Sequence, residues 1–344
     1  MKRWSFFAAL GLFFLVRVAD AQEPQAALGT LERINVFGAS LEGNLMGESV
    51  SPEVSVYLPA SYNSEANRRY PVVYILHGYT GTDQGWFGPE GRRQSDLIAD
   101  RVFAGGGAQE MILVMPNCYN AYGGCMYANS ATSGYWEDYI SADLVAYVDN
   151  HYRTIPVRAA RGLAGHSMGG YGVMRIGMNR PDVFSSLYAL SSCCLNEMSP
   201  RGGERALAME RIKTAEDLAE ANRALRTFAV TAAWAPNPEN PPFYFDLPTK
   251  NGEVIPEVAA RFAVNSPMAM LDSHAGALRK MTAIMMDVGE QDGLIGANRA
   301  LSEAMTRFGV HHTFETYEGD HSNRISERFE KSVLPFFSRH LMFE

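Results

Sequence analysis

The chain contains 344 residues, of which 47% are hydrophobic and 20% are charged, and its formal net charge at pH 7 is −8. This length and apolar content are enough for one large hydrophobic core, or for one domain that carries an elaborated insertion. An acidic chain without a basic run is a poor candidate for binding nucleic acid or an anionic membrane.

Residues 1–21 have the pattern of a signal peptide. A basic start precedes the apolar run 4–16, and residues 19–21 place small side chains at the positions that a signal peptidase reads. We therefore expect cleavage before Gln22 and a secreted or periplasmic protein. Arg17 lies close to the apolar run, so a retained N-terminal anchor stays open as an alternative. No other stretch is apolar enough to span a bilayer, and no membrane association is expected after cleavage.

Strands and helices alternate along most of the chain. Short continuous apolar runs suit interior parallel strands, and amphipathic or packed stretches between them suit helices. This alternation predicts an α/β fold, with a mostly parallel sheet covered by helices on both faces. The predicted strands are 51–59, 71–76, 111–115, 161–164, 184–190, 282–287 and 313–317, and the predicted helices are 95–102, 137–152, 171–178, 296–308 and 325–340.

Residues 196–262 interrupt this alternation. The stretch 205–225 is helical in composition, whereas 236–242 contains too many prolines for regular structure. We interpret this segment as an insertion or cap on a single domain that spans residues 22–344.

The segment Gly165-His166-Ser167-Met168-Gly169 joins a predicted strand to a predicted helix. A nucleophile elbow requires this context, because its serine sits on a sharp and strained turn. A side chain at either flanking glycine would collide with a neighbouring strand or helix. The helix dipole and free N–H groups favour an exposed serine Oγ there. Ser167 is therefore the predicted nucleophile, and a glycine-rich turn that merely contains serine is the alternative.

A serine nucleophile requires a general base, which on such a sheet follows the nucleophile and the acid along the chain. His321 follows the predicted strand 313–317 and precedes the last helix, which is the expected place for the base. The other histidines after Ser167 are less suitable. His274 precedes any acid-bearing strand, His311 and His312 begin a strand and so lie at the wrong end, and His340 lies in the terminal helix.

The acid is expected in the loop after strand 282–287. Asp292 lies at the tip of this loop, where Gly293 allows the chain to turn, and is the favoured residue. Asp287 and Glu290 stay open as alternatives. Asp320, beside the base, is interpreted as a residue that shapes its loop.

The tetrahedral intermediate requires two backbone donors. One is expected from Met168, the residue after the nucleophile, and the other from Tyr79 in the glycine-containing loop after strand 71–76. We expect His77 to hold this loop rather than to act as a base.

Four cysteines are present at positions 118, 125, 193 and 194. Export permits disulfides, and four cysteines allow three pairings. Cys118 and Cys125 are spaced to close a loop, whereas a bond between the adjacent Cys193 and Cys194 would be strained. Free thiols are an equal alternative for each pair. The spacings do not resemble a zinc site, and no metal is expected.

Several segments together resemble the putative esterase family of the α/β-hydrolase superfamily, which includes feruloyl esterases, S-formylglutathione hydrolase (esterase D) and mycobacterial mycolyltransferases. The resemblance implies a hydrolase that needs no cofactor, with Ser167, Asp292 and His321 at the matching positions. Its closest likeness is to secreted feruloyl-esterase-like members. The segments that carry it are 41–47, 54–59, 76–81, 120–124, 134–139, 165–170, 287–294 and 317–321.

The first functional hypothesis is a secreted serine carboxylic-ester hydrolase that forms an acyl-enzyme on Ser167. Its expected substrates are small or polysaccharide-linked esters, with feruloyl, other aryl or acetyl groups on plant polysaccharide. Trp86, Trp136 and Phe243 are candidate substrate-binding residues, although packing is the more frequent role of such side chains. The alternatives are an acyltransferase to a sugar acceptor and a non-catalytic secreted binding protein. The sequence does not indicate the oligomeric state.

Overall fold

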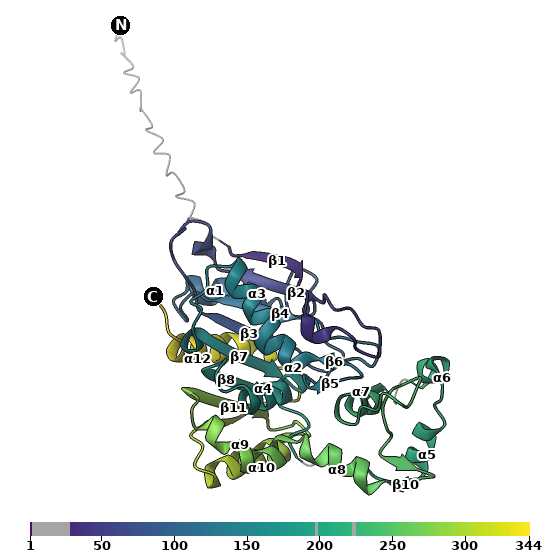
Figure 1. Ribbon diagram of the computed structural model, residues 1–344. Coiled ribbons are helices and arrows are strands. Elements are labelled where there is room, and N and C mark those ends of the chain that lie inside the picture. The colour runs from purple at the N-terminus through teal and green to yellow at the C-terminus, as the bar shows by residue number, and fades with distance from the viewer. Residues whose placement is uncertain (2–27, 197–198, 222–224) are drawn as a thin grey trace.

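The computed structural model describes residue 1 and residues 28–196, 199–221 and 225–344 (Figure 1). Apart from Met1, the predicted signal peptide lies outside the described residues.

An eight-stranded sheet forms the centre of the molecule, in the order β1-β2-β4-β3-β7-β8-β11-β12. The six strands from β4 to β12 are parallel, and β1 and β2 are antiparallel to their neighbours. This confirms the predicted mostly parallel α/β sheet. The strands are β1 Thr30–Asn35, β2 Glu53–Leu58, β3 Val72–Leu76, β4 Ile112–Pro116, β7 Arg161–His166, β8 Ser186–Leu190, β11 Ala283–Gly289 and β12 Thr313–Tyr317.

Helices cover both faces of this sheet (Figure 1). On one face lie α1 (Ser95–Ala104) and the C-terminal helical segment, which consists of α11 (Ile325–Arg328), a π-helical turn at Phe329–Val333 and α12 (Leu334–His340). The other face carries a larger group of helices: α2 Trp136–Asp138, a π-helical turn at Tyr139–Asp143, α3 Leu144–His151, α4 Met168–Asn179, α9 Pro267–Leu278 and α10 Ile295–Arg307.

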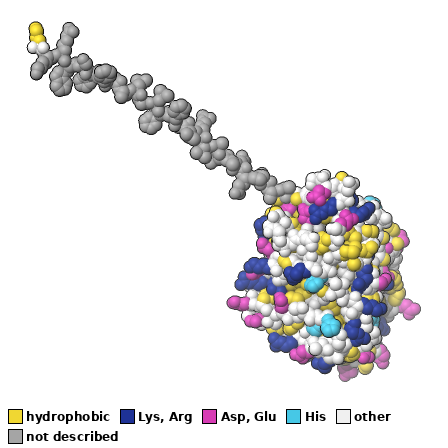
Figure 2. All heavy atoms as spheres, turned by 90° about the vertical axis from the view of Figure 1, so that its left-hand side faces the viewer, with side chains coloured by type: hydrophobic (Ala, Val, Ile, Leu, Met, Phe, Trp, Pro, Cys, Tyr) yellow, Lys and Arg dark blue, Asp and Glu magenta, His cyan; other side chains and the backbone are white. Residues whose placement is uncertain are grey.

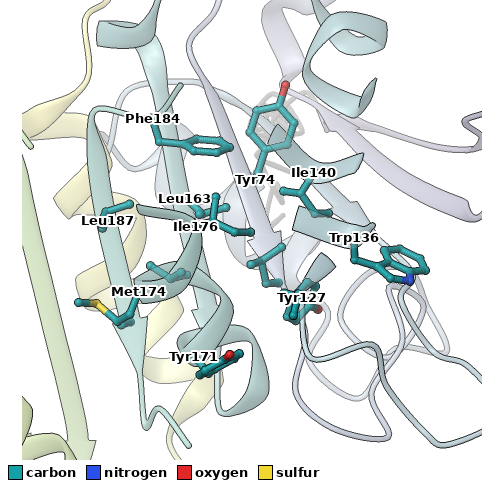
Figure 3. Packing of buried hydrophobic residues seen from close by; sticks show 14 of the residues in the cluster. Tyr74, Tyr127, Trp136, Ile140, Leu163, Tyr171, Met174, Ile176, Phe184 and Leu187 are labelled. Carbon is teal, nitrogen blue, oxygen red and sulfur yellow. The ribbon is translucent and has the colours of Figure 1, made fainter. Parts of the chain in front are cut away.

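The two hydrophobic cores follow from the two-residue period of the strands. In β3, Val72, Tyr74 and Leu76 point into the core beneath α3 and α4, whereas Val73 and Ile75 point to the opposite face. Figure 3 shows the first core, where side chains from the sheet and from α4 interlock. The strand ends that carry the site are therefore held by packing on both sides.

The segment between β8 and β11 leaves the sheet and forms a group of short elements. Its composition predicted one helical stretch at 205–225, and the structure has two short helices there. An aromatic cluster of Phe228, Phe243 and Phe245 packs it against Tyr122 of the main body. Figure 1 shows most of this segment beside the sheet rather than on it. The elements are α5 Glu204–Glu210, α6 Ala215–Glu220, α7 Leu225–Trp234, β9 Thr249–Lys250, β10 Glu253–Val254 and α8 Pro256–Val264.

The face of the molecule in Figure 2 carries Lys and Arg side chains interspersed with Asp and Glu. No helix within the described ranges is long and apolar enough to cross a membrane.

Candidate active site

Ser167 lies at the sharp turn between β7 and α4, with φ 57° and ψ −111°. This conformation is strained for a residue with a side chain, and close packing enforces it. A Cβ at Gly169 would lie 1.9 Å from the carbonyl oxygen of Leu76, and one at Gly165 would lie 2.4 Å from the carbonyl oxygen of Gly169. Glycine is therefore required at both positions, and the serine side chain is held at the end of the sheet.

The structure brings Ser167, His321 and Asp292 into one hydrogen-bonded chain. His321 Nε2 lies 2.9 Å from Ser167 Oγ, and His321 Nδ1 lies 2.8 Å from Asp292 Oδ2. Because a carboxylate accepts, the Nδ1 proton points to Asp292 and Nε2 is free to accept the serine proton. This tautomer is the one that a general base requires.

Asp292 is 4% exposed, and its second carboxylate oxygen accepts the Leu294 N–H at 2.9 Å. The two alternative acids face elsewhere. Asp287 accepts hydrogen bonds from Tyr188 and Arg328, at 2.7 and 2.8 Å, and Glu290 is exposed beside Thr316. Only Asp292 of the three predicted candidates contacts the histidine.

Asp320 accepts the backbone N–H groups of Ser322 and Asn323. These hydrogen bonds lower the pKa of the Asp320 carboxyl. It thus shapes the turn that presents His321. The histidines set aside at 311, 312 and 340 line a cavity near the first residues of β11 and β12, at the opposite end of the strands.

His166 was not among the predicted site residues, yet it supports the base. Its Nε2–H donates to the carbonyl oxygen of His321 at 2.8 Å, and the two rings lie 4.8 Å apart. Burial, then His321 and Arg93, lower the pKa of His166 to about 3, so its ring stays neutral at ordinary pH. The only sequence signal for this role was the position of His166 directly before Ser167.

The two predicted oxyanion donors come from the turns that follow β7 and β3, and Tyr79 and Ser167 line the same cavity. Met168 is the first residue of α4, where a helix leaves its N–H groups unpaired, and Tyr79 lies in the loop that follows β3. Across the described segments, neither N–H has a hydrogen-bond acceptor. His77 is fully buried in the same loop, where it accepts the Cys118 N–H at 3.0 Å and its other ring nitrogen contacts the Gly78 carbonyl.

A cavity of about 320 Å³ opens at Ser167 and His321, and Tyr79 and Trp86 line it. Of the three aromatic residues predicted to bind substrate, only Trp86 is found there. Trp136 packs against Tyr139 in the core and donates its indole N–H to the Ser133 carbonyl (Figure 3). Phe243 belongs to the aromatic cluster of the segment between β8 and β11, and lines a separate cavity of about 720 Å³.

The four cysteines are free thiols. Cys118 and Cys125 are fully buried beside the His77 loop. Cys193 donates its N–H to the carbonyl oxygen of Ser167 at 3.1 Å, which ties the nucleophile to the chain after β8. In the part of the chain that the structure describes, no group of three or more His, Cys, Asp or Glu side chains is placed to hold a metal ion.

The parallel sheet, the elbow after β7 and the order serine, aspartate, histidine along the chain define the class: this is an α/β-hydrolase. Residues 46–332 match the family described as "Putative esterase". The chain therefore belongs to that esterase family, which confirms the resemblance indicated by the motifs.

Two of the curated relatives that match this chain show how much of it is shared. Esterase MT1326 of Mycobacterium tuberculosis is 33% identical over 129 residues, which is 36% of this chain and 25% of that protein. An endo-1,4-beta-xylanase/feruloyl esterase of Xylanibacter ruminicola is 28% identical over 135 residues, 38% of this chain and 18% of that protein. The matched segments thus span a quarter or less of the length of these relatives.

Solved structures share the fold over nearly the whole chain. A ferulic acid esterase has a TM-score of 0.65 at 23% identity, with 92% of this chain and 100% of the other covered. An S-formylglutathione hydrolase from Agrobacterium tumefaciens has a TM-score of 0.59 at 17% identity, with coverages of 93% and 98%. These likenesses confirm the α/β-hydrolase fold.

Proposed function

We propose that the protein is a serine carboxylesterase that forms an acyl-enzyme on Ser167. The observation that carries this proposal is the hydrogen-bonded chain from Ser167 through His321 to Asp292, in the tautomer that lets the histidine accept a proton. Membership of the esterase family supports the same reaction class.

In the first half-reaction the Ser167 Oγ attacks the ester carbonyl carbon while its proton moves to His321 Nε2. The new imidazolium is stabilised by Asp292. The negative charge that develops on the carbonyl oxygen is accepted by the N–H groups of Tyr79 and Met168. His321 then returns the proton to the departing alcohol oxygen, the C–O bond breaks, and the acyl group stays on Ser167.

In the second half-reaction water attacks the acyl-enzyme, and His321 takes one of its protons. The intermediate collapses to the free acid, and the proton returns to Ser167. The side chain of His321 is 40% exposed, so solvent reaches the base that must activate the water. This exposure favours hydrolysis over acyl transfer to a sugar acceptor. Product analysis with and without added sugar distinguishes the two outcomes.

The proposed substrates are feruloyl or other aryl esters, and acetyl esters, of plant polysaccharide. Support comes from Trp86, which is one of the residues that line the cavity at Ser167, and from the relatives whose names include feruloyl or ferulic acid esterase. A panel of feruloyl, acetyl and short alkyl esters, compared by kcat/KM, tests this part. Equal turnover of all of them would contradict an aryl preference.

The test of the nucleophile is hydrolysis of a p-nitrophenyl ester by wild type and by Ser167→Ala. We expect the variant to lose several orders of magnitude in kcat, because the residual rate comes only from binding and the oxyanion donors. The matched control is Ser273→Ala. This serine of α9 does not line the cavity at Ser167, and the variant should keep the wild-type rate. Equal rates in wild type and Ser167→Ala would remove the assignment.

We also propose that residues 1–21 direct export and that residues 22–344 form the mature single domain with its insertion at 196–262. The pattern of basic, apolar and small residues in 1–21 supports this. N-terminal sequencing of the protein recovered outside the cytoplasm should find Gln22 first. Recovery of an intact Met1 from a membrane fraction would instead favour the retained anchor.

A further inference from the structure

Two arginines line the same cavity as the nucleophile. Arg92 is exposed and Arg93 is half-buried, and both contribute to the wall of the 320 Å³ cavity that holds Ser167 and His321. Among the described residues that line this cavity there is no aspartate or glutamate. The open part of the site is therefore positively charged.

Neither guanidinium has an ion-pair or hydrogen-bond partner among residues 28–196, 199–221 and 225–344. Other half-buried arginines in the described ranges use their donors, either on carboxylates or, as Arg153 and Arg158 do, on backbone carbonyl oxygens. Examples of carboxylate pairing are Arg175 with Glu137 at 2.9 Å and Arg328 with Asp287 at 2.8 Å. The nitrogen atoms of Arg92 and Arg93 are not among the fully buried unpartnered atoms, so their N–H donors face the open cavity and are available to a ligand.

Arg93 is nevertheless held in place. Its Cζ lies 4.9 Å from the centroid of the Trp86 ring, and that ring packs edge-on against Phe329. The Ser95 N–H donates to the Trp86 carbonyl at 2.8 Å, which closes the loop and carries Arg93 back over the indole. Stacking orients the plane of the guanidinium but satisfies none of its donors.

The charge of Arg93 persists at neutral pH. Burial and then the neighbouring Arg92 lower the pKa of Arg93 to about 10, which leaves the guanidinium protonated. The positive charges of Arg92 and Arg93 thus lie close together without a carboxylate partner among the described residues. An anion bound between them would reduce their repulsion and accept hydrogen bonds from their N–H groups.

The position of Arg93 indicates which part of an ester would meet it. Arg93 stacks on Trp86, and Trp86 packs edge-on against Phe329 in the helical segment that follows the His321 loop. His166, which donates to the His321 carbonyl, lines the same cavity as Arg93. The arginine therefore lies on the histidine side of Ser167. The departing alcohol also lies on that side, because His321 Nε2 must give it a proton.

We infer that the active site selects esters whose alcohol part carries an oxyanion, a carboxylate or a phosphate, with Arg93 as the main ligand and Arg92 as the second. This inference rests on the proposed esterase function and narrows its substrate class. Planar carboxylates and phosphates match the fork of an arginine, and such charge-assisted pairs are the stronger hydrogen bonds of proteins.

The first experiment compares two acetyl esters of similar shape, 4-acetoxybenzoate and the neutral 4-acetoxybenzamide. We expect wild type to favour the benzoate in kcat/KM by about ten- to hundredfold, the range of a charged hydrogen-bonded pair. Arg93→Gln should remove most of this ratio, and Arg92→Gln a smaller part. Arg93→Lys keeps the charge but loses the two-pronged hydrogen-bonding geometry, so its kcat/KM ratio should lie between those of wild type and Arg93→Gln.

The matched control is Arg299→Gln, which removes one exposed arginine of α10 and should leave the ratio unchanged. Thermal unfolding of each variant checks that the fold is retained. A wild-type ratio of one or below, or the same ratio in wild type and Arg93→Gln, would overturn the inference. Mono(4-nitrophenyl) adipate and its methyl ester test a carboxylate in the acyl part. If wild type prefers the charged ester of this pair but not 4-acetoxybenzoate, the placement of Arg93 beside the alcohol part is wrong.

Calorimetry with Ser167→Ala separates this inference from the proposed function, since binding does not require turnover. If wild type hydrolyses neither ester, the esterase proposal fails. Tighter binding of the benzoate than of the amide, lost in Ser167→Ala/Arg93→Gln, would still support the anion site. Equal binding of the two would overturn it. The same titration with 4-acetoxyphenyl phosphate shows which of the two oxyanions binds more tightly.

Discussion

Asp287 and Asp292 belong to one strand-loop segment, and their surroundings separate their roles. Asp287 is fully buried within β11, where Tyr188 and Arg328 use one of its oxygens. Burial raises the pKa of Asp287, and Arg328 opposes this effect. Asp292 lies beyond the strand and gives one oxygen to His321 and the other to the backbone of its own loop. The Asp287–Arg328 ion pair holds β11 to α11, and the Asp292–His321 hydrogen bond fixes the orientation of the proposed base.

Substitution should separate these two roles. Asp292→Asn keeps the size of the side chain but can no longer favour the required tautomer of His321, and in serine-hydrolase triads this change costs about 10⁴ in kcat. The protein should remain folded. The measurement is kcat on a p-nitrophenyl ester together with urea unfolding.

Asp287→Asn is the control for that prediction. It removes one charge of a buried ion pair, whose partner Arg328 has a side chain only 15% exposed, and should lower the free energy of unfolding by about 3 kcal/mol. Its kcat under folded conditions should stay near wild type. The reverse pattern, with the loss of kcat in Asp287→Asn alone, would contradict the assignment of the acid.

The buried His166 predicts a pH dependence of stability. Its pKa in the folded protein is about 3, against 6.5 as the ordinary value, so between these pH values the unfolded chain binds a proton that the native ring does not. The stability from this group is therefore complete above pH 6.5 and is lost as the pH falls, by up to about 1.4 kcal/mol per pH unit. His166→Gln should show a shallower acid dependence in urea unfolding between pH 6.5 and 4. An unchanged slope would contradict a neutral buried ring.

The predicted positions of Ser167, His321 and Asp292 came from chain order, because loops at the ends of parallel strands meet at one edge of a sheet. The same reasoning could not find His166, whose hydrogen bond to the His321 carbonyl joins residues far apart in the sequence. Nor could it separate Trp86 from Trp136, because both were expected in loops near the site. Tertiary packing places Trp86 at the cavity and Trp136, the first residue of α2, in the core.

At the scale of elements, the turn from β7 into α4 depends on the space that glycine leaves. Gly169→Ala would drive a Cβ into the Leu76 carbonyl of β3, which is backbone and cannot yield. We expect a loss of several kcal/mol in the free energy of unfolding, or failure to accumulate folded protein. Thermal and urea unfolding measure this.

Gly296→Ala is the matched control within a helix. Gly296 belongs to α10, and a Cβ there would meet nothing within 4 Å. The substitution should stabilise the protein by about 0.5–1 kcal/mol, because alanine loses less conformational entropy in a helix. If Gly169→Ala and Gly296→Ala change the free energy of unfolding equally, close packing against Leu76 is not the reason that glycine is required at position 169.

The central strands were predictable because strands buried on both faces form continuous apolar runs. The edge strand β1 was missed, since Glu32 and Arg33 interrupt its apolar character and its burial is partial. The helix α9 was also missed, because its sequence shows no clear polar face even though Leu271 and Leu278 are buried against the core. Elements that depend on tertiary contacts for their stability leave the weakest local signal.

For the whole molecule, the segment between β8 and β11 is joined to the oxyanion loop through aromatic packing. Phe228 of α7 is fully buried and lies 5.8 Å from the Tyr122 ring. The Tyr79 hydroxyl donates to the Tyr122 carbonyl at 2.9 Å, and the Tyr79 side chain packs against the same cluster. The inserted segment thus supports Tyr79, whose N–H is the proposed second oxyanion donor.

Phe228→Ala should therefore affect both stability and rate. Removal of a buried phenylalanine ring costs about 3–5 kcal/mol in the free energy of unfolding. A small displacement of Tyr79 would also weaken its N–H as an oxyanion donor, and we expect kcat to fall about tenfold. Phe336→Ala is the control: this residue of α12 is 6% exposed and packs against Tyr188 on the other face of the sheet. It should lose comparable stability and keep its kcat when both variants are assayed well below their unfolding midpoints. An equal fall in kcat for the two variants would mean that the rate follows global stability rather than the contact between the inserted segment and the oxyanion loop.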